Sequence, residues 1–118
     1  SIVNRLVYNN VEFLFTGDAE EEVESELLEL PINLDVDVLK VGHHGSSSSS
    51  SEEFLKAVDP EIAVIQVGED NPFDHPHLRT IRRLENLEIP ILRNDLDGLI
   101  SLYTDGENIV YEYENKNK

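Results

Sequence analysis

Asp18 and the four histidines are of the types that bind divalent metals or transfer protons, and they fall at three places along the chain where one expected element ends and the next begins. Asp18 follows an apolar run directly, and the four histidines form the pairs His43-His44 and His75-x-His77. Neutral imidazole and carboxylate are suitable ligands for zinc, manganese or iron, and no cysteine is present to compete with them. The pattern therefore predicts a divalent-metal site built from one Asp and several His.

Each of the three motifs also has a simpler structural explanation. A Gly-Asp pair before a helix is most often a helix cap. A histidine pair in a loop is more often structural than a ligand, and a His-Pro-His run can be a turn before a helix. The combination is more specific than its parts, because all three motifs stand where one expected element ends and the next begins. Loops at such junctions often carry functional groups.

The elements expected to position these residues alternate between strands and helices. Apolar–polar alternation, turn residues and helical periodicity predict the order ββ-α-β-α-β-α-β-ββ, which is typical of a layered α/β domain. Asp18 is expected to cap the first helix, and the six serines at 46–51 are expected to end in a serine cap on the second. The strands are expected at 2–8, 11–15, 36–41, 62–67, 89–92, 98–103 and 108–113, and the helices at about 19–30, 52–58 and 77–87.

Length and composition limit the class of protein. The chain has 118 residues, which fits one domain, and no linker divides it. It starts at Ser1 and contains no Met, so we expect a fragment of a longer protein. No stretch approaches the roughly 20 apolar residues of a membrane span. The sequence does not indicate a compartment.

The charge of the chain bears on its partners. A net charge of −16 argues against broad electrostatic capture of nucleic acid, so nucleic-acid chemistry here would need metal ions or a local basic patch. Four arginines do lie close together in the sequence, although such a run is most often a solvated helix face. They are Arg79, Arg82, Arg83 and Arg93.

Three consecutive segments together resemble one region of a known family. They are FLFTGDAEEEVESELL, DVLKVGHHGSSSSSSEEFLKAVDP and IAVIQVGEDNPFDHPHLRTIRRLENLEIPILRNDLDG. This succession of GD, HHGS and HPH motifs is similar to the C-terminal half of the metallo-β-lactamase-like domain in ComEC-type DNA-uptake proteins and their soluble relatives. The resemblance implies that residues 1–118 form half of an αββα sandwich, with a mixed sheet and helices on one face.

The same resemblance implies roles for individual residues. Asp18 resembles the carboxylate that joins the metals, and one of His43 and His44 resembles the last metal ligand. His44 is favoured as the ligand and His43 as the residue that faces the substrate, although the sequence leaves open which is which. His75 and His77 resemble a later element at the rim of the site, and His77 is included with His43 as a catalytic candidate. The metal implied for the intact domain is zinc or manganese.

The chain departs from the family in one respect that bears on function. Complete members carry an HxHxDH-like or HxxxDH-like motif in the first half of the domain, and no histidine precedes His43 here. We therefore expect the missing N-terminal half to be a partner, and we expect this chain alone to bind little or no metal and to be inactive.

The function expected of the intact protein is metal-dependent hydrolysis of a phosphodiester or nucleic-acid substrate. The alternative is a binding or structural module that keeps the fold without catalysis. Because helices can cover only one face of the expected sheet, we also expect the chain alone to form a homo-oligomer.

Overall fold

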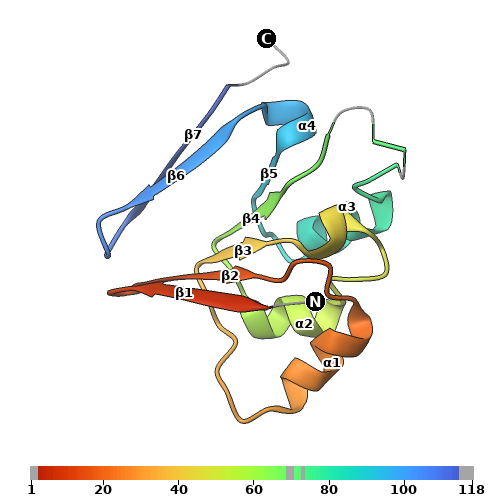
Figure 1. Cartoon of the computed structure of the whole chain (residues 1–118), viewed down its shortest axis with the longest axis horizontal. Helices are drawn as coiled ribbons and strands as arrows, with labels where there is room; N and C mark the ends of the chain where they lie inside the picture. Colours follow the sequence, from red (N-terminus) through yellow and green to blue (C-terminus); the bar gives the residue numbers. More distant parts are fainter. Residues whose placement is uncertain (1–2, 69–70, 73, 115–118) are drawn as a thin grey trace.

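A computed structural model describes residues 3–68, 71–72 and 74–114 (Figure 1). The described residues contain a five-stranded sheet in the order β1-β2-β3-β4-β5, together with a separate hairpin of β6 and β7. β1 pairs with β2 in the antiparallel sense, whereas β2 to β5 are parallel to one another, so the sheet is mixed. The strands of the sheet are β1 Asn4–Tyr8, β2 Val11–Phe15, β3 Val38–Lys40, β4 Ile62–Ile65 and β5 Ile91–Arg93.

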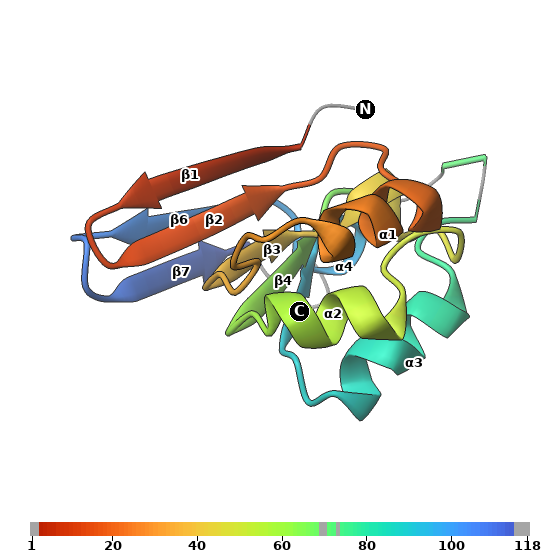
Figure 2. The same ribbon diagram turned by 90° about the horizontal axis from the view of Figure 1, so that it is seen from below.

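Three helices connect the parallel strands and lie together on one side of the sheet (Figure 2). Their apolar side chains form one core with one face of the sheet, and fully buried members of that core include Leu39, Phe54 and Leu84. The expected arrangement of a mixed sheet with helices on one face is therefore confirmed. The helices are α1 Glu21–Glu29, α2 Glu52–Val58 and α3 Leu78–Asn86.

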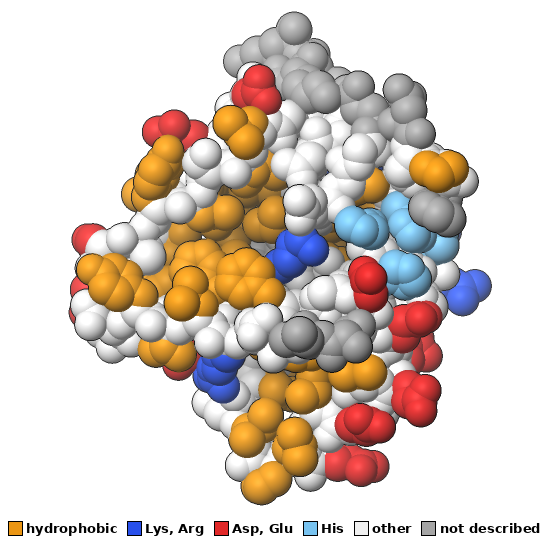
Figure 3. Space-filling view, viewed as in Figure 1, with side chains coloured by type: hydrophobic (Ala, Val, Ile, Leu, Met, Phe, Trp, Pro, Cys, Tyr) orange, Lys and Arg blue, Asp and Glu red, His pale blue; other side chains and the backbone are white. Residues whose placement is uncertain are grey.

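The second face of the sheet is covered in part by the hairpin of β6 Ile100–Thr104 and β7 Ile109–Tyr113. Ile100, Leu102 and Ile109 of the hairpin belong to a smaller core with strand residues of this face. Figure 3 shows apolar side chains gathered between β1–β2 and the hairpin. This face is therefore only partly closed by the chain itself.

Several boundaries agree with those expected from the sequence, and others are shorter or shifted: the strand expected at 36–41 covers 38–40, and those expected at 89–92 and 98–103 cover 91–93 and 100–104. The strand at 11–15, the helix at 52–58 and its serine cap are confirmed, with Ser51 Oγ accepting a hydrogen bond from the Phe54 amide at 3.3 Å. The first strand was expected from residue 2, which lies outside the described residues. Two short helical turns were not predicted. They are η1 Gly42–Gly45 and α4 Asn94–Asp97.

The prediction that Asp18 caps the first helix is wrong. α1 begins at Glu21, and its N-cap position is Glu20, which makes no side-chain cap bond. The Glu21 amide instead donates to the carbonyl of Ser48 at 2.9 Å. The serine loop thus satisfies a donor that a capping side chain would otherwise take, and Asp18 stays exposed in the preceding turn.

Candidate functional site

The turn that contains Asp18 and the turn that contains His43 lie side by side and are hydrogen-bonded to each other. β2 and β3 are parallel neighbours, so both turns leave the sheet at the same edge. The His43 amide donates to the carbonyl of Gly17 at 2.8 Å, and the Thr16 hydroxyl donates to the carbonyl of Lys40 at 2.9 Å. The two motifs are therefore held together by backbone and side-chain hydrogen bonds.

The His43-His44 pair occupies a strained turn. Both residues have left-handed backbone conformations, with φ of 50° and 53°. Such values are uncommon for residues with a side chain and cluster at functional sites. His43 is half-buried and His44 is exposed. The turn is closed by the Ser46 amide, which donates to the carbonyl of His43 at 2.9 Å.

The second histidine pair packs against the first. The His77 amide donates to the carbonyl of Gly45 at 3.0 Å, which ties the 75–77 segment to the end of the first turn. The His75 ring is central to the group. Its centroid lies 4.7 Å from that of His77, 5.5 Å from that of His43 and 6.3 Å from that of His44. All four histidines therefore form one cluster, seen as a single pale-blue group in Figure 3.

Crowding of these rings affects their protonation. The pKa of His75 is lowered from its ordinary value of 6.5, first by burial and then by repulsion from the charged forms of His77, His43 and His44, while Asp74 opposes the shift. The centre of the cluster is therefore biased toward the neutral imidazole. A neutral imidazole can donate through one ring nitrogen and accept or bind a metal through the other.

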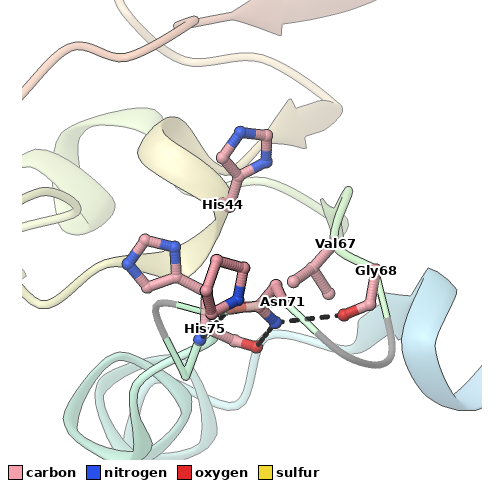
Figure 4. Close-up of a pocket in the computed structure, with 6 residues that line it drawn as sticks. His44, Val67, Gly68, Asn71 and His75 are labelled. Atoms are coloured by element: carbon pink, nitrogen blue, oxygen red, sulfur yellow. Dashed lines mark hydrogen bonds between the residues drawn. The ribbon is translucent and has the colours of Figure 1, made fainter.

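The hydrogen bond of His44 determines which of its nitrogens is available. Nδ1 lies 2.7 Å from the carbonyl oxygen of Gln66. Because a carbonyl can only accept, Nδ1 must carry the proton, and the neutral ring has its lone pair on Nε2. A histidine that binds a metal through one ring nitrogen usually donates the N–H of the other nitrogen to an acceptor such as a backbone carbonyl. Figure 4 shows His44 and His75 beside the same pocket.

His77 has the opposite arrangement. Its Nδ1 accepts a hydrogen bond from the Ser47 amide at 2.8 Å, and the Ser47 hydroxyl lies 3.1 Å away. An amide can only donate, so Nδ1 carries the lone pair and the neutral ring has its proton on Nε2. His77 is thus arranged to donate a hydrogen bond, whereas His44 is arranged to accept one or to bind a metal.

The structure brings the four histidines together but does not assemble a complete metal centre. Among the described residues, no group of three or more His, Cys, Asp or Glu side chains is placed to hold a metal ion. Burial lowers the pKa of Lys40, and the negative charge of Asp18 nearby opposes part of that shift. The structure thus brings the histidines together, and the metal-ligand roles expected of Asp18 and His44 remain predictions.

Comparison with known proteins identifies the family. Residues 1–69 match the model of the metallo-beta-lactamase superfamily. The chain belongs to the metallo-beta-lactamase superfamily. This agrees with the mixed α/β sheet and with the histidine turn at the end of β3.

Curated relatives confirm the resemblance to ComEC-type proteins. The chain is 36% identical over 98% of its length to ComE operon protein 3 of Bacillus subtilis and 41% identical over 85% to competence protein ComA of Neisseria gonorrhoeae. It is 37% identical over 74% of its length to recombination protein 2 of Haemophilus influenzae. It spans only 14%, 15% and 11% of these proteins, respectively. Within the part of the chain that the structure describes, no helix is long and apolar enough to cross a membrane.

Sequence reasoning missed residues that hold the histidines in place. The Asn71 side chain brackets His75, since its Oδ1 accepts from the His75 amide at 2.8 Å and its Nδ2 donates to the His75 carbonyl at 2.7 Å. Asn71 also lines a cavity of about 180 Å³ together with His44 and His75. An Asn in a loop has no periodic signal, so only its nearness to the His-Pro-His motif could have suggested this role.

Proposed function

We propose that this chain is the C-terminal part of a metal-dependent phosphodiester hydrolase domain of the metallo-beta-lactamase superfamily. In this proposal Asp18 and His44 are two ligands of a divalent ion, zinc or manganese. The remaining ligands come from a partner segment outside the chain, the N-terminal half of the domain. The observation that carries the proposal is the bond between His44 Nδ1 and the Gln66 carbonyl, which leaves the lone pair of the neutral ring on Nε2.

His43 and His77 are proposed to act on the substrate. The proton on His77 Nε2 suits a hydrogen bond to an anionic phosphate oxygen or to a leaving oxygen. His43 shares the strained turn with His44, so its ring lies within the same cluster at the edge of the sheet. A divalent ion, when bound, would lower the pKa of a water molecule and neutralise charge on the phosphate.

The substrate class is proposed from charge and from the relatives. A chain of net charge −16 repels polyanions, so a nucleic-acid substrate would be held chiefly by the metal and by short-range donors such as His77. One of the similar proteins is named a competence protein, one a ComE operon protein and one a recombination protein. We therefore propose that the natural polypeptide hydrolyses a nucleic-acid phosphodiester during DNA uptake.

The test compares variants of the natural polypeptide that contains this chain. Asp18→Ala and His44→Ala should each abolish manganese-dependent hydrolysis of bis-p-nitrophenyl phosphate and weaken manganese binding measured by calorimetry. Asp105→Ala, in the exposed turn between β6 and β7, is the matched control and should change neither. Full activity in both Asp18→Ala and His44→Ala would overturn the proposal.

The second candidate function is a non-catalytic binding module. It is favoured by the lack, among the described residues, of a group of three or more side chains that could hold an ion. If the natural polypeptide binds no manganese or zinc and hydrolyses no phosphodiester, this candidate replaces the first.

A further inference from the structure

The serine loop, residues 46–51, is a packed part of the domain and not a linker. Ser46, Ser49 and Ser50 are buried, with exposed fractions of 5%, 0% and 1%. The Ser49 hydroxyl donates to the carbonyl of Gly42 at 3.1 Å, which fixes the loop to the histidine turn. Small side chains allow this backbone to pass between α1, α2 and α3, so its peptide groups must find partners there.

One set of partners comes from α1. The carboxylate of Glu24 is almost fully buried, with 2% exposed, and each oxygen accepts a backbone hydrogen bond. The Ser50 amide donates to one oxygen at 2.5 Å, and the Ser51 amide donates to the other at 2.9 Å. A buried carboxylate is costly unless it is hydrogen-bonded in this way, which explains why the loop and α1 stay in contact.

The complementary set of partners comes from α3. Nη1 of Arg83 donates to the carbonyl oxygens of Ser49 and Ser50, each at 3.2 Å, and approaches that of Ser47 at 3.5 Å. Neither Arg83 nor Glu24 takes part in an ion pair among the residues that the structure describes. Glu24 thus accepts hydrogen bonds from two amides of the loop, and Arg83 donates hydrogen bonds to two of its carbonyls.

The amide of Ser47, in the same loop, contacts the ring of His77 in the histidine cluster. The Ser47 N–H donates to Nδ1 of His77 at 2.8 Å. Rotation of the peptide group of Ser47 would remove this donor, and Nδ1 could then carry the proton. The tautomer of His77 therefore depends on how firmly the serine loop is held.

We infer that Arg83 and Glu24 are positioning residues: by clamping the serine loop from two sides, they aim the Ser47 amide at His77 Nδ1 and keep the His77 proton on Nε2. The benefit of that tautomer for phosphate binding rests on the proposed function. The clamp itself does not, since it is defined by contacts within this chain. The sequence motifs did not indicate it, because Glu24 and Arg83 belong to acidic and basic runs of ordinary helix faces.

Nitrogen-15 NMR of this chain, without metal or substrate, tests the inference directly. A hydrogen bond from an amide nitrogen to a ring nitrogen transmits a coupling between the two nitrogen nuclei. The wild-type chain should show this coupling between Ser47 N and His77 Nδ1, with the His77 proton on Nε2. A His77 ring protonated on Nδ1, or the absence of the coupling in the folded wild type, would overturn the inference without any variant.

Variants then separate positioning from a general structural role. Arg83→Met and Glu24→Gln should each weaken or remove the coupling, while the His44 ring signals stay in place. Arg83→Lys retains a cation with several donors and should restore part of the coupling. Arg82→Met is the matched control, because Arg82 is exposed on the same helix and should leave the coupling unchanged.

The outcomes also distinguish this inference from the proposed function. If the chain shows the coupling but the natural polypeptide proves non-catalytic, the positioning of His77 by Arg83 and Glu24 stands. Only its proposed use in hydrolysis is then rejected. An unchanged coupling in folded Arg83→Met and Glu24→Gln chains shows that the loop holds its shape without the clamp, which rejects the inference.

Discussion

The backbone amide of His43 lies 2.8 Å from the carbonyl oxygen of Gly17 and donates a hydrogen bond to it. This bond joins two motifs that are far apart in the sequence and meet because β2 and β3 are parallel neighbours. The two turns also lie close together at Gly42. A Cβ on Gly42 would lie 3.0 Å from Thr16 Oγ1 and 3.1 Å from the carbonyl oxygen of Ala19.

Gly42→Ala should therefore destabilise the domain, because an added methyl group would force the two turns apart. Overpacking of this kind costs about 1–3 kcal/mol in the free energy of unfolding. Urea denaturation followed by circular dichroism measures the change. Gly68→Ala is the matched control, since a Cβ there meets no heavy atom within 4 Å and should alter stability by less than about 0.5 kcal/mol. Equal stability of Gly42→Ala and Gly68→Ala would contradict the close approach.

Thr80→Val should stabilise the domain. Thr80 is fully buried at the start of α3, and its hydroxyl has no hydrogen-bond partner among the described residues. Replacing the hydroxyl with a methyl group of similar size removes the cost of a buried, unsatisfied polar group, which is about 1–3 kcal/mol. Thermal unfolding of the two chains in the same buffer measures the difference. A lower melting temperature for Thr80→Val would mean that the hydroxyl is satisfied in solution.

The strands and helices could be predicted from the sequence more completely than the arrangement of the histidines. The apolar runs that became β2 and β4 have a period and a length that follow from burial on a sheet, so 11–15 was predicted to the residue. The helical turn at Gly42–Gly45 follows no period, because it depends on two left-handed residues, of which His43 is held by the Gly17 carbonyl. The sequence placed the histidines at element ends but could not show that they meet.

The tautomers could not be read from the sequence at all. His44 and His77 are the same residue type, and only the carbonyl of Gln66 and the amide of Ser47 make one a donor and the other an acceptor at Nδ1. Those partners lie in loops, where tertiary contacts and not local propensity decide the backbone direction. The serine run was correctly predicted as a capped loop, but its burial against Glu24 and Arg83 required the structure.

Glu24 should make stability depend on pH in a direction that can be stated. Burial raises its pKa above the ordinary value of 4.5, although the Ser50 and Ser51 amides oppose the shift. Between the unfolded pKa and the higher folded pKa, the folded chain binds more protons. The contribution of Glu24 to stability is therefore fully present below pH 4.5 and falls as pH rises through that window.

Chemical denaturation of the wild type and Glu24→Gln at a series of pH values isolates this contribution. The stability of the wild type relative to Glu24→Gln should decrease as pH rises above about 4.5. Glu29→Gln, an exposed position at the end of the same helix, should show no such trend relative to the wild type. An increase with pH would mean that the two amides outweigh burial.

His77→Ala should impair hydrolysis in the natural polypeptide, if the proposed function is correct. A positioned proton donor contributes about 10²–10⁴-fold to rate, so kcat should fall within that range while manganese affinity stays near that of the wild type. A lower kcat with unchanged manganese affinity would distinguish His77 from His44, because replacement of His44 should lower both kcat and manganese affinity. Loss of manganese binding in His77→Ala would place His77 among the ligands instead.

The incompletely covered second face of the sheet leads to the last prediction. Leu6, Tyr8 and Phe15 remain 54%, 51% and 40% exposed on β1 and β2, and Tyr111 and Tyr113 of the hairpin are 46% and 43% exposed. Phe13 packs in the small core with the hairpin, and Leu6 pairs with Phe13 across the two strands. Because side chains two residues apart on a strand share a face, Leu6, Tyr8 and Phe15 lie on the face that carries the hairpin. An apolar surface of this kind favours association when no other segment covers it.

We expect this chain alone to form a two-fold homodimer through that face, and the dimer should tighten as salt screens the repulsion between two chains of net charge −16. Light scattering across a salt series measures the molecular mass. Phe15→Lys should shift the equilibrium to monomer at every salt concentration. Leu30→Lys, at an apolar position that is also exposed but lies at the end of α1, should leave it unchanged. A monomer at high protein and salt concentrations would show that β6 and β7 cover the face sufficiently by themselves.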